Sequence, residues 1–339
     1  NEDMHLSEAN GQKMNYKYIS IFVEFPDEDM QDYHLDTEDC VSNAYNYFNG
    51  DDTVTALNEY NNPIPVTSLK RYVEKYSYGN CSVEAGIFPK NSSGEVVSYV
   101  THNPRTYYMP YDEEKNPNGY KDDQEQRTRE LDLIKEIATM TGSRIESSYG
   151  SGELDADKDG YIDALSFFME SKNYGNQEIG WNDLLWSHKM SVSAGEITRI
   201  GNYRVNAYNL INCYDYEQYG GIFSSVKPSY GTIIHEFMHT LGYPDLYRYY
   251  QSGVPVGVYD LMASTDGHMP QGLLAYTIQN KGWRQPLEEI ASTTSDITLT
   301  DAQYNDSSEK NAVIVKSPMS NNEFFVVEYQ AKRSNTYST

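Results

Sequence analysis

Residues 231–247 read GTIIHEFMHTLGYPDLY, and this stretch decides which fold the chain must build. His235 and His239 lie one helical turn apart, a spacing that lets both imidazoles reach a single metal ion. Glu236 directly follows the first histidine, where a general base can act on water beside that ion. The stretch therefore predicts a helix that carries a catalytic metal site.

The apolar residues of the same stretch predict how this helix is seated. At about 100° per residue, the two histidines and Glu236 fall on one side of the helix. The opposite arc is apolar and consists of Ile233, Ile234, Phe237, Met238 and Leu241. The apolar arc would seat the helix in the core while the polar side lines a cleft.

Two imidazoles leave one protein ligand missing, and the residues after the helix offer it. Gly242 is placed to end the helix in a left-handed conformation that turns the chain back toward the metal. Asp245 follows three residues later, and its carboxylate can occupy the third position. Zinc is the expected ion, because two histidines, a carboxylate and an open fourth position describe its catalytic sites.

A second metal loop is indicated upstream, where aspartates alternate as oxygen ligands do in calcium loops. Gly160 stands where such a loop turns sharply, but Ser166 replaces the bidentate glutamate of an EF-hand. A structural calcium loop is therefore expected, with an acidic solvated turn as the alternative. The candidate ligands are Asp155, Asp157, Asp159 and Asp163.

The patterning of the chain predicts two parts after a polar N-terminus. We expect residues 1–15 to be disordered or extended, and residues 16–285 to form the metal-binding domain. The later pattern consists of short β runs, ITLT, AVIVK and FFVVEY. Residues 286–339 are therefore predicted to be β-rich, as the start of an all-β module.

Several elements are predicted within the larger part. Residues 16–25, YKYISIFVEF, are typical of a buried strand, and the acidic stretch 27–62 of a solvated loop. Helical spacing of apolar residues predicts a helix over residues 124–140, with Gly142 as its stop signal. Two further strands are predicted, over residues 161–169 and 203–209.

Charge and hydropathy exclude other classes of protein. The chain has 26 Lys+Arg against 50 Asp+Glu, a formal net charge of −24, which argues against nucleic acid as a partner because phosphate contacts need clustered basic side chains. The sequence contains no uninterrupted apolar run of about 18 residues, so no transmembrane segment is expected. The three cysteines, Cys40, Cys81 and Cys213, show no metal spacing, and one bridge with one free thiol or three free thiols fit equally well.

Taken together, these motifs resemble the immune inhibitor A family of secreted bacterial zinc metallopeptidases, metzincin-like enzymes with the string HExxHxxGxxD. Segments in matching order support the resemblance: ISIFVEFPD, LDADKDGYIDALSFF, LLWSHKM, GVYDLMAS, NKGW and EFFVVEYQ. The resemblance implies an α+β fold, in which a metzincin-like catalytic domain has a mixed twisted sheet, an active-site helix and a Met-turn subdomain. A β-rich module would begin after it.

The resemblance also implies roles for individual residues. Met262 would form the Met-turn beneath the zinc, and the backbone carbonyl of Tyr161 would be a further calcium ligand. Ser264 stands where many metzincins have a tyrosine that stabilises the oxyanion, so nearby Tyr259 and His268 are the candidates for that role. His188, in WSHK, is expected to make a structural hydrogen bond.

We therefore expect a secreted or cell-surface zinc endopeptidase, monomeric, that acts on a protein or peptide substrate. Zinc would lower the pKa of its bound water toward about 7, and Glu236 would move that water's proton to the leaving amine. The substrate would lie extended along a sheet edge beside the helix.

Two alternatives remain open. In a thermolysin-like enzyme, Glu288 or Glu289 would be the third zinc ligand in place of Asp245. Without catalysis, the chain would be a calcium-stabilised surface or adhesion module with a degenerate HExxH site.

Overall fold

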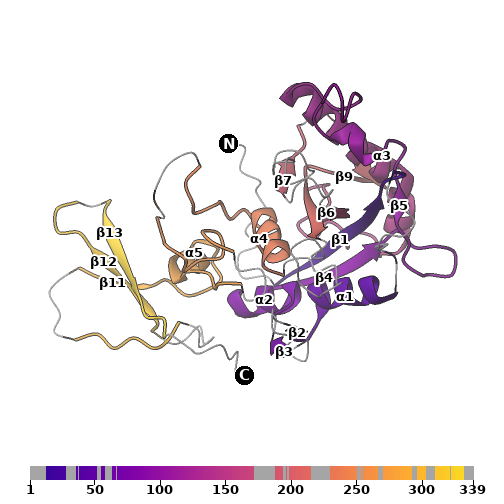
Figure 1. The fold of residues 1–339 in the computed structure, drawn as a ribbon. Coiled ribbons are helices and arrows are strands. Elements are labelled where there is room, and N and C mark those ends of the chain that lie inside the picture. The colour runs from indigo at the N-terminus through magenta and orange to yellow at the C-terminus, as the bar shows by residue number, and fades with distance from the viewer. Residues whose placement is uncertain are drawn as a thin grey trace.

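The computed structural model describes residues 13–27, 36, 38–51, 55–57, 63–65, 67–171, 188–193, 196, 198–214, 230–249, 253, 255–265, 270–291, 296–302, 310–320 and 322–331. They form a mixed α+β arrangement around one central sheet (Figure 1). None of the helices in these ranges is both long and apolar enough to span a bilayer.

The central sheet has six strands, in the order β4-β1-β6-β10-β7, with β5 beside β1. All its pairings are parallel except the last, in which β7 runs antiparallel to β10. The strands are β1 (Met14–Glu24), β4 (Cys81–Phe88), β5 (Tyr99–Val100), β6 (Ala164–Ser171), β7 (His188–Ser191) and β10 (Ala207–Tyr214). Within the described ranges, the antiparallel strand β7 thus lies at an edge of the sheet.

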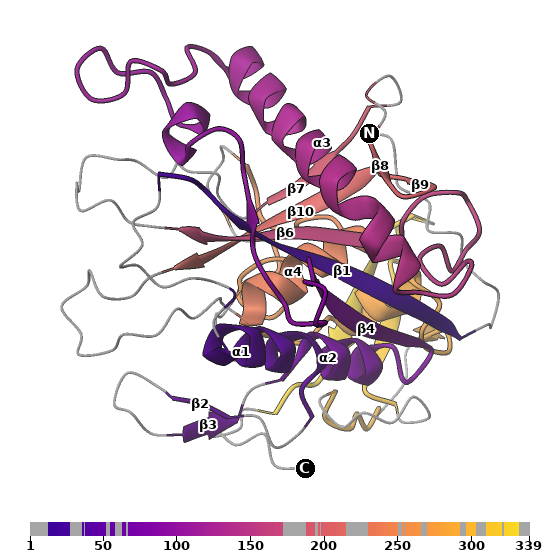
Figure 2. The same ribbon diagram turned by 90° about the vertical axis from the view of Figure 1, so that its right-hand side faces the viewer.

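Helices cover both faces of this sheet, as a largely parallel sheet requires (Figure 2). On one face pack α1 (Glu38–Asn49), α2 (Leu69–Tyr76) and α4 (Tyr230–Thr240). On the other face lies α3 (Asp123–Ser147), preceded by the short 3-10 helix η1 (Arg105–Tyr108). β1 serves both cores, because Tyr18 and Phe22 face the first and Ile19 and Ile21 the second.

Helix α1 contradicts the prediction of a solvated loop over residues 27–62. Cys40, Ala44, Tyr47 and Phe48 are buried and repeat at the spacing of one helix face. At the end of the helix, the side chain of Asn49 pairs with the backbone of Ala85 through hydrogen bonds of 2.8 and 2.9 Å. The apolar stripe explains why this segment forms a helix packed on the sheet, while the charged residues lie on the outer face of that helix.

Helix α3 continues through Gly142, so the prediction that this glycine stops the helix is wrong. A Cβ at Gly142 would lie 2.7 Å from the backbone nitrogen of Gly201 and 3.1 Å from Cα of Ile200. Gly142 is therefore needed for the close approach of α3 to the hairpin of β8 (Arg199–Ile200) and β9 (Tyr203–Arg204).

The predicted strands are found with shifted bounds. β1 begins two residues before the predicted start, and β6 begins three residues after it. The stretch 203–209 is divided between β9 and β10 instead of forming one strand. A two-stranded ladder of β2 (Thr55–Leu57) and β3 (Pro63–Pro65) was not predicted.

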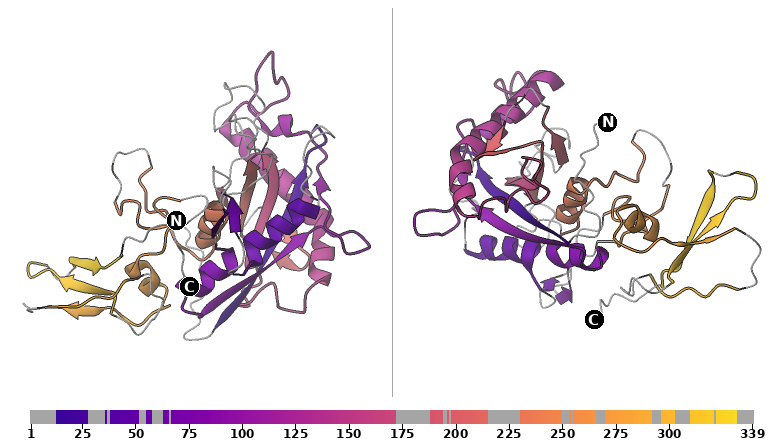
Figure 3. Two further views of the ribbon diagram at one scale, coloured as in Figure 1. Left: turned by 60° about the horizontal axis from the view of Figure 1, so that its bottom comes forward. Right: turned by 180° about the vertical axis from the view of Figure 1, so that it is seen from behind.

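The C-terminal part forms a separate three-stranded sheet to one side of the central sheet, with α5 (Ala275–Asn280) between them (Figure 3). It consists of β11 (Glu288–Ile290), β12 (Ala312–Lys316) and β13 (Phe324–Glu328). Its small core joins α5 to the sheet through Ala275, Leu287, Ala312 and Ile314. Residues 312–316 and 324–328 confirm the predicted strands, whereas residues 297–300 form none.

Cys40 and Cys81 are both buried, and neither forms a disulfide bond within the described residues. No bridge therefore joins these two, and burial raises the pKa of the Cys81 thiol to about 12.

Candidate metal centre

Helix α4 carries the two histidines, and its predicted apolar arc is buried. Ile233, Ile234, Phe237 and Met238 have no exposed surface, and Leu241 is 4% exposed. Gly242 has the predicted positive φ, +80°. The amide of Gly242 donates to the carbonyl of His239 (2.9 Å) and that of Tyr243 to the carbonyl of Met238 (3.0 Å), the Schellman pattern that reverses the chain.

Both imidazole rings are held by main-chain carbonyl groups. Nδ1 of His235 lies 3.1 Å from the carbonyl oxygen of Leu261, and Nδ1 of His239 lies 2.7 Å from that of Tyr243. A carbonyl oxygen can only accept, so each Nδ1 carries the proton and each Nε2 of the neutral ring presents a lone pair. Metal-binding histidines are oriented in this way.

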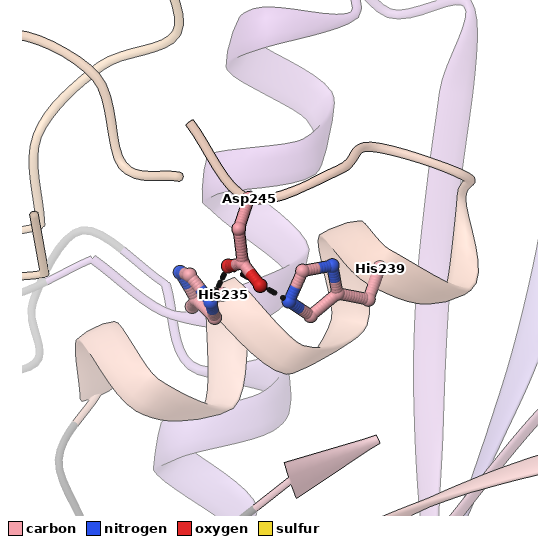
Figure 4. A group of neighbouring side chains, drawn as sticks. All are labelled: His235, His239 and Asp245. Atoms are coloured by element: carbon pink, nitrogen blue, oxygen red, sulfur yellow. Dashed lines mark ion pairs between the residues drawn. The ribbon is translucent and has the colours of Figure 1, made fainter. Parts of the chain in front are cut away.

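Both lone pairs point at one carboxylate oxygen (Figure 4). Oδ1 of Asp245 lies 3.1 Å from Nε2 of His235 and 3.3 Å from Nε2 of His239. Among the described residues, this buried oxygen has no further hydrogen bond, whereas Oδ2 accepts one from the hydroxyl of Tyr249. Burial would raise the pKa of Asp245, but the two histidines and Tyr249 outweigh it and hold that pKa well below its usual range.

The donor set therefore fits a metal ion. The Nε2 atoms of two imidazoles and one carboxylate oxygen converge on one point, an arrangement that a cation stabilises. Their chemistry is that of zinc with two His and one carboxylate ligand. Among the His, Cys, Asp and Glu side chains of the described ranges, only one other cluster brings three ligand atoms so close, and it consists of Asp155, Asp157 and Asp159.

Glu236 lies beside this centre with a free carboxylate oxygen. Its side chain is 7% exposed, and no described residue forms a hydrogen bond with the buried Oε2. Burial raises the pKa of Glu236, although the neighbouring histidines oppose the rise. A carboxylate with a raised pKa and an unused oxygen can accept a proton from water.

A tight turn at Met262 supports the helix. Met262 has no exposed surface, and its carbonyl accepts a 2.8 Å hydrogen bond from the amide of Leu246, next to Asp245. Asp260, also fully buried, accepts hydrogen bonds of 2.8 Å from the amides of Met262 and Leu274. The sequence analysis missed Asp260, although an Asp two residues before a turn is a common signal for this bonding pattern.

Of the two candidates for oxyanion stabiliser, only Tyr259 lies within the described residues. Tyr259 is 62% exposed and makes no hydrogen bond to His235, Glu236 or Asp245 within the described part of the chain. His268 lies outside the described residues. The tyrosine at the centre is Tyr249, which the sequence analysis did not single out.

The alternative third ligands lie in another sheet. Glu288 and Glu289 belong to β11, where they form ion pairs with Lys310 and Lys316 respectively. Asp245 therefore takes the position beside the histidines, and the thermolysin-like alternative is not supported by the structure.

The aspartate loop before β6 is folded as a tight turn, with φ +87° at Gly160. Oxygens of Asp155, Asp157 and Asp159 lie within 4.8 Å of one another. Asp163 lies at the base of the loop, where its carboxylate accepts from the amide of Ala156 (2.9 Å). Burial, reinforced by the neighbouring aspartates, raises the pKa of Asp163 to about 7. The fifth candidate is the backbone carbonyl of Tyr161, the residue after Gly160; the amide of Tyr161 donates to Oδ1 of Asp159 (2.8 Å).

His188 has the structural hydrogen bond expected of it, and its partner is Glu130 on α3, 3.0 Å away. Glu130 is 6% exposed and also accepts a 2.6 Å hydrogen bond from the hydroxyl of Tyr208. A signal was present in the sequence, because Glu130 shares the helix face of the apolar Leu133, Ile134 and Ile137.

Comparison with known proteins identifies a family that matches most of the chain. Residues 5–285 match the family described as immune inhibitor A peptidase M6, catalytic domain. The chain is 24% identical over 273 residues to the pre-pro-metalloprotease PrtV of two Vibrio cholerae serotype O1 strains. That match covers 75% of this chain but 28% of PrtV, so the chain spans less than a third of its relative.

Among solved structures, two crystal structures of wild-type OgpA from Akkermansia muciniphila are matched at 13% identity. The TM-scores are 0.36 and 0.34, with 79% of this chain and 60% or 59% of OgpA covered. The family match, which extends over most of the chain, identifies this protein as a member of the immune inhibitor A (M6) family of zinc metalloendopeptidases.

Proposed function

We propose that this chain hydrolyses peptide bonds with zinc held by His235, His239 and Asp245, and with Glu236 as the general base. The observation that carries the proposal is the convergence of both Nε2 lone pairs on the unpartnered Oδ1 of Asp245. Zinc bound there would supply Lewis acidity and lower the pKa of water toward about 7.

The protein's own groups perform the remaining steps. Glu236 accepts the proton of the attacking water at its free Oε2 and delivers it to the nitrogen of the leaving amine. The carbonyl groups of Leu261 and Tyr243 keep the histidine rings in the required tautomer. Met262 supports the site from below as the Met-turn. Tyr259 and His268 are the candidates for the group that stabilises the oxyanion.

The substrate is proposed to be a protein or peptide that lies extended beside β7. This strand is one of the two ends of the strand order β4-β1-β6-β10-β7 in the described part of the chain, and α4 packs next to it. An extended peptide can add to such an edge by main-chain hydrogen bonds.

Calcium at the aspartate loop is a further part of the proposal. It is supported by the clustered oxygens of Asp155, Asp157 and Asp159 and by buried Asp163, with the carbonyl of Tyr161 as the fifth candidate ligand. Such loops in extracellular proteins bind calcium near millimolar levels. This fits a secreted or cell-surface enzyme, which we propose acts as a monomer with a catalytic domain over residues 16–285 and a β-rich segment over 286–339.

The test is hydrolysis of a generic protein substrate by the purified chain, with and without a zinc chelator. We expect cleavage that the chelator abolishes and added zinc restores. Glu236→Gln should keep zinc bound and lose about 10²-fold or more in kcat. Full activity in Glu236→Gln would refute the assigned base, and absence of cleavage by zinc-loaded wild type would favour the non-catalytic surface or adhesion module.

A further inference from the structure

Edge strand β7 is bound to a helix on each face of the sheet. Consecutive residues of a strand point to opposite faces, and here they are two cationic or titratable side chains, His188 and Lys189. His188 faces α3, where it meets the buried carboxylate of Glu130. Lys189 faces α4, which carries the metal-binding histidines. The strand proposed to receive the substrate is thus held from both sides.

Lys189 contacts α4 at the start of the turn that leads to Asp245. Its Nζ donates to the carbonyl oxygen of His239 over 2.9 Å. The same oxygen accepts the amide of Gly242, the first hydrogen bond of the helix-ending turn. A lysine at this place suits the negative end of the helix dipole and gives a second donor to a carbonyl of the last helical turn.

The lysine is also partly buried, which is costly for a charged group. Burial lowers the pKa of Lys189 to about 8, while the charge of Glu236 opposes that shift. An apolar residue would fill this space without the cost. Packing alone therefore does not explain a lysine at this partly buried position, whereas its hydrogen bond to the His239 carbonyl does.

The opposite face keeps β7 from adjusting independently. Glu130 accepts from the Tyr208 hydroxyl (2.6 Å) and contacts Nε2 of His188 (3.0 Å), and it is itself 6% exposed. Tyr208 belongs to β10, the pairing partner of β7. Glu130 therefore ties the two strands to α3, so a shift of β7 toward or away from α4 would disturb this network.

We propose that Lys189 is a positioning residue that sets the location of edge strand β7 relative to the turn carrying Asp245. This inference rests on the proposed peptidase function, in which a peptide lies along β7 and reacts beside Glu236. Lys189 fixes the distance between the bound peptide and the reacting centre without touching the peptide. Its loss would leave peptide binding to β7 largely intact but misplace the scissile bond.

The first test compares kinetics of the zinc-loaded wild type with Lys189→Met, which keeps the length of the aliphatic stem. We expect kcat to fall about 10-fold to 100-fold, the worth of one hydrogen bond to a charged group, with KM changed less than about 3-fold. Lys189→Arg restores a charged donor and should recover most of kcat. The matched control is Lys17→Met, on β1 of the same sheet, where the lysine forms an exposed ion pair with Glu84.

The second test does not depend on activity. Hydrogen exchange of the Gly242 and Tyr243 amides should be faster in Lys189→Met than in wild type, because the carbonyl that organises this turn has lost a donor. Should Lys189→Met fail to fold, Lys189→Gln removes the charge with a polar side chain and is measured in the same way.

The outcomes separate the two proposals. A wild-type kcat in Lys189→Met, or a loss that Lys189→Arg does not recover, overturns the positioning role. If zinc-loaded wild type cleaves nothing, the peptidase proposal fails. Unchanged exchange at Gly242 and Tyr243 would overturn the coupling of Lys189 to the turn in either case.

Discussion

Removing the carboxylate of Asp260 should loosen the turn beneath the metal centre. This residue has no exposed surface, and its two oxygens each accept a 2.8 Å hydrogen bond from a backbone amide, of Met262 and of Leu274. Asp260→Ala leaves both amides without their partner in a buried site. At about 1–3 kcal/mol for each orphaned donor, the free energy of unfolding should fall by roughly 2–6 kcal/mol.

The effect should extend to the metal. The Asp260 turn fixes the carbonyl of Leu261, which holds the His235 ring, and the carbonyl of Met262, which accepts from Leu246 next to Asp245. Loss of groups that orient metal ligands weakens metal binding by about 10–100-fold. We therefore expect Asp260→Ala to bind zinc about 10-fold or more weakly, measured by competition with a chromophoric chelator.

Thermal unfolding of Asp260→Ala and of two comparison variants, Asp260→Asn and Asp132→Ala, tests this prediction. With about 2–4 °C for each kcal/mol, the Tm of Asp260→Ala should fall by about 4 °C or more. Asp260→Asn keeps one acceptor oxygen and should lie between wild type and Asp260→Ala. Asp132→Ala, at an exposed position of α3, should change stability by less than about 0.5 kcal/mol. A Tm and a zinc affinity of Asp260→Ala equal to those of wild type would refute the reasoning.

Three further predictions follow from other features. Gly142→Ala should destabilise the fold by about 1–3 kcal/mol through overpacking against β8, although alanine favours helices. The control in chemical denaturation is Ser143→Ala, at an exposed position of the same helix. Equal stability of the two variants would contradict the close approach of α3 to β8. Calcium at about 100 times its Kd should stabilise the zinc-loaded protein by about 2.7 kcal/mol, which is measured as an increase in Tm. Asp159→Asn should remove this increase, and Asp112→Asn, which lies outside the loop, should not. Burial would raise the pKa of Glu130, but His188 and Tyr208 outweigh it and lower that pKa. Ionised Glu130 therefore stabilises the fold at pH values above its unfolded-state pKa of about 4.3, and this stabilisation is lost as the pH falls below that value. The Tm of Glu130→Gln should lie below that of wild type at pH 7, with a difference that narrows in acid; a difference independent of pH would count against this ion pair.

The close approach of His235, His239 and Asp245 could be predicted from the sequence because the information that determines it is local. His235, His239, Gly242 and Asp245 lie within eleven residues, counted from position 235 to position 245, and helix geometry with one left-handed glycine determines how they converge. No knowledge of the remaining chain was needed to place Oδ1 near both rings.

What the sequence did not reveal depends on contacts between distant segments. Glu130 and His188 are 58 residues apart, and Lys189 and His239 are 50 apart, so no local pattern pairs them. Gly142 is a residue type that often ends helices, but here it lies inside α3, where the backbone of Gly201 comes too close for a side chain. In residues 38–49 the acidic composition concealed an apolar face, because a charge count ignores periodicity.

The hydrogen-bonded turn between His239 and Asp245 has a practical consequence. Because two main-chain hydrogen bonds close it, the ligand arrangement is preorganised by the backbone and little ordering is left for the ion to impose. Stripping the enzyme and reconstituting it with cobalt should therefore be feasible without refolding, which opens the centre to visible spectroscopy. By the same reasoning, inserting even one residue between Gly242 and Asp245 should abolish reconstitution while the remainder of the protein stays folded.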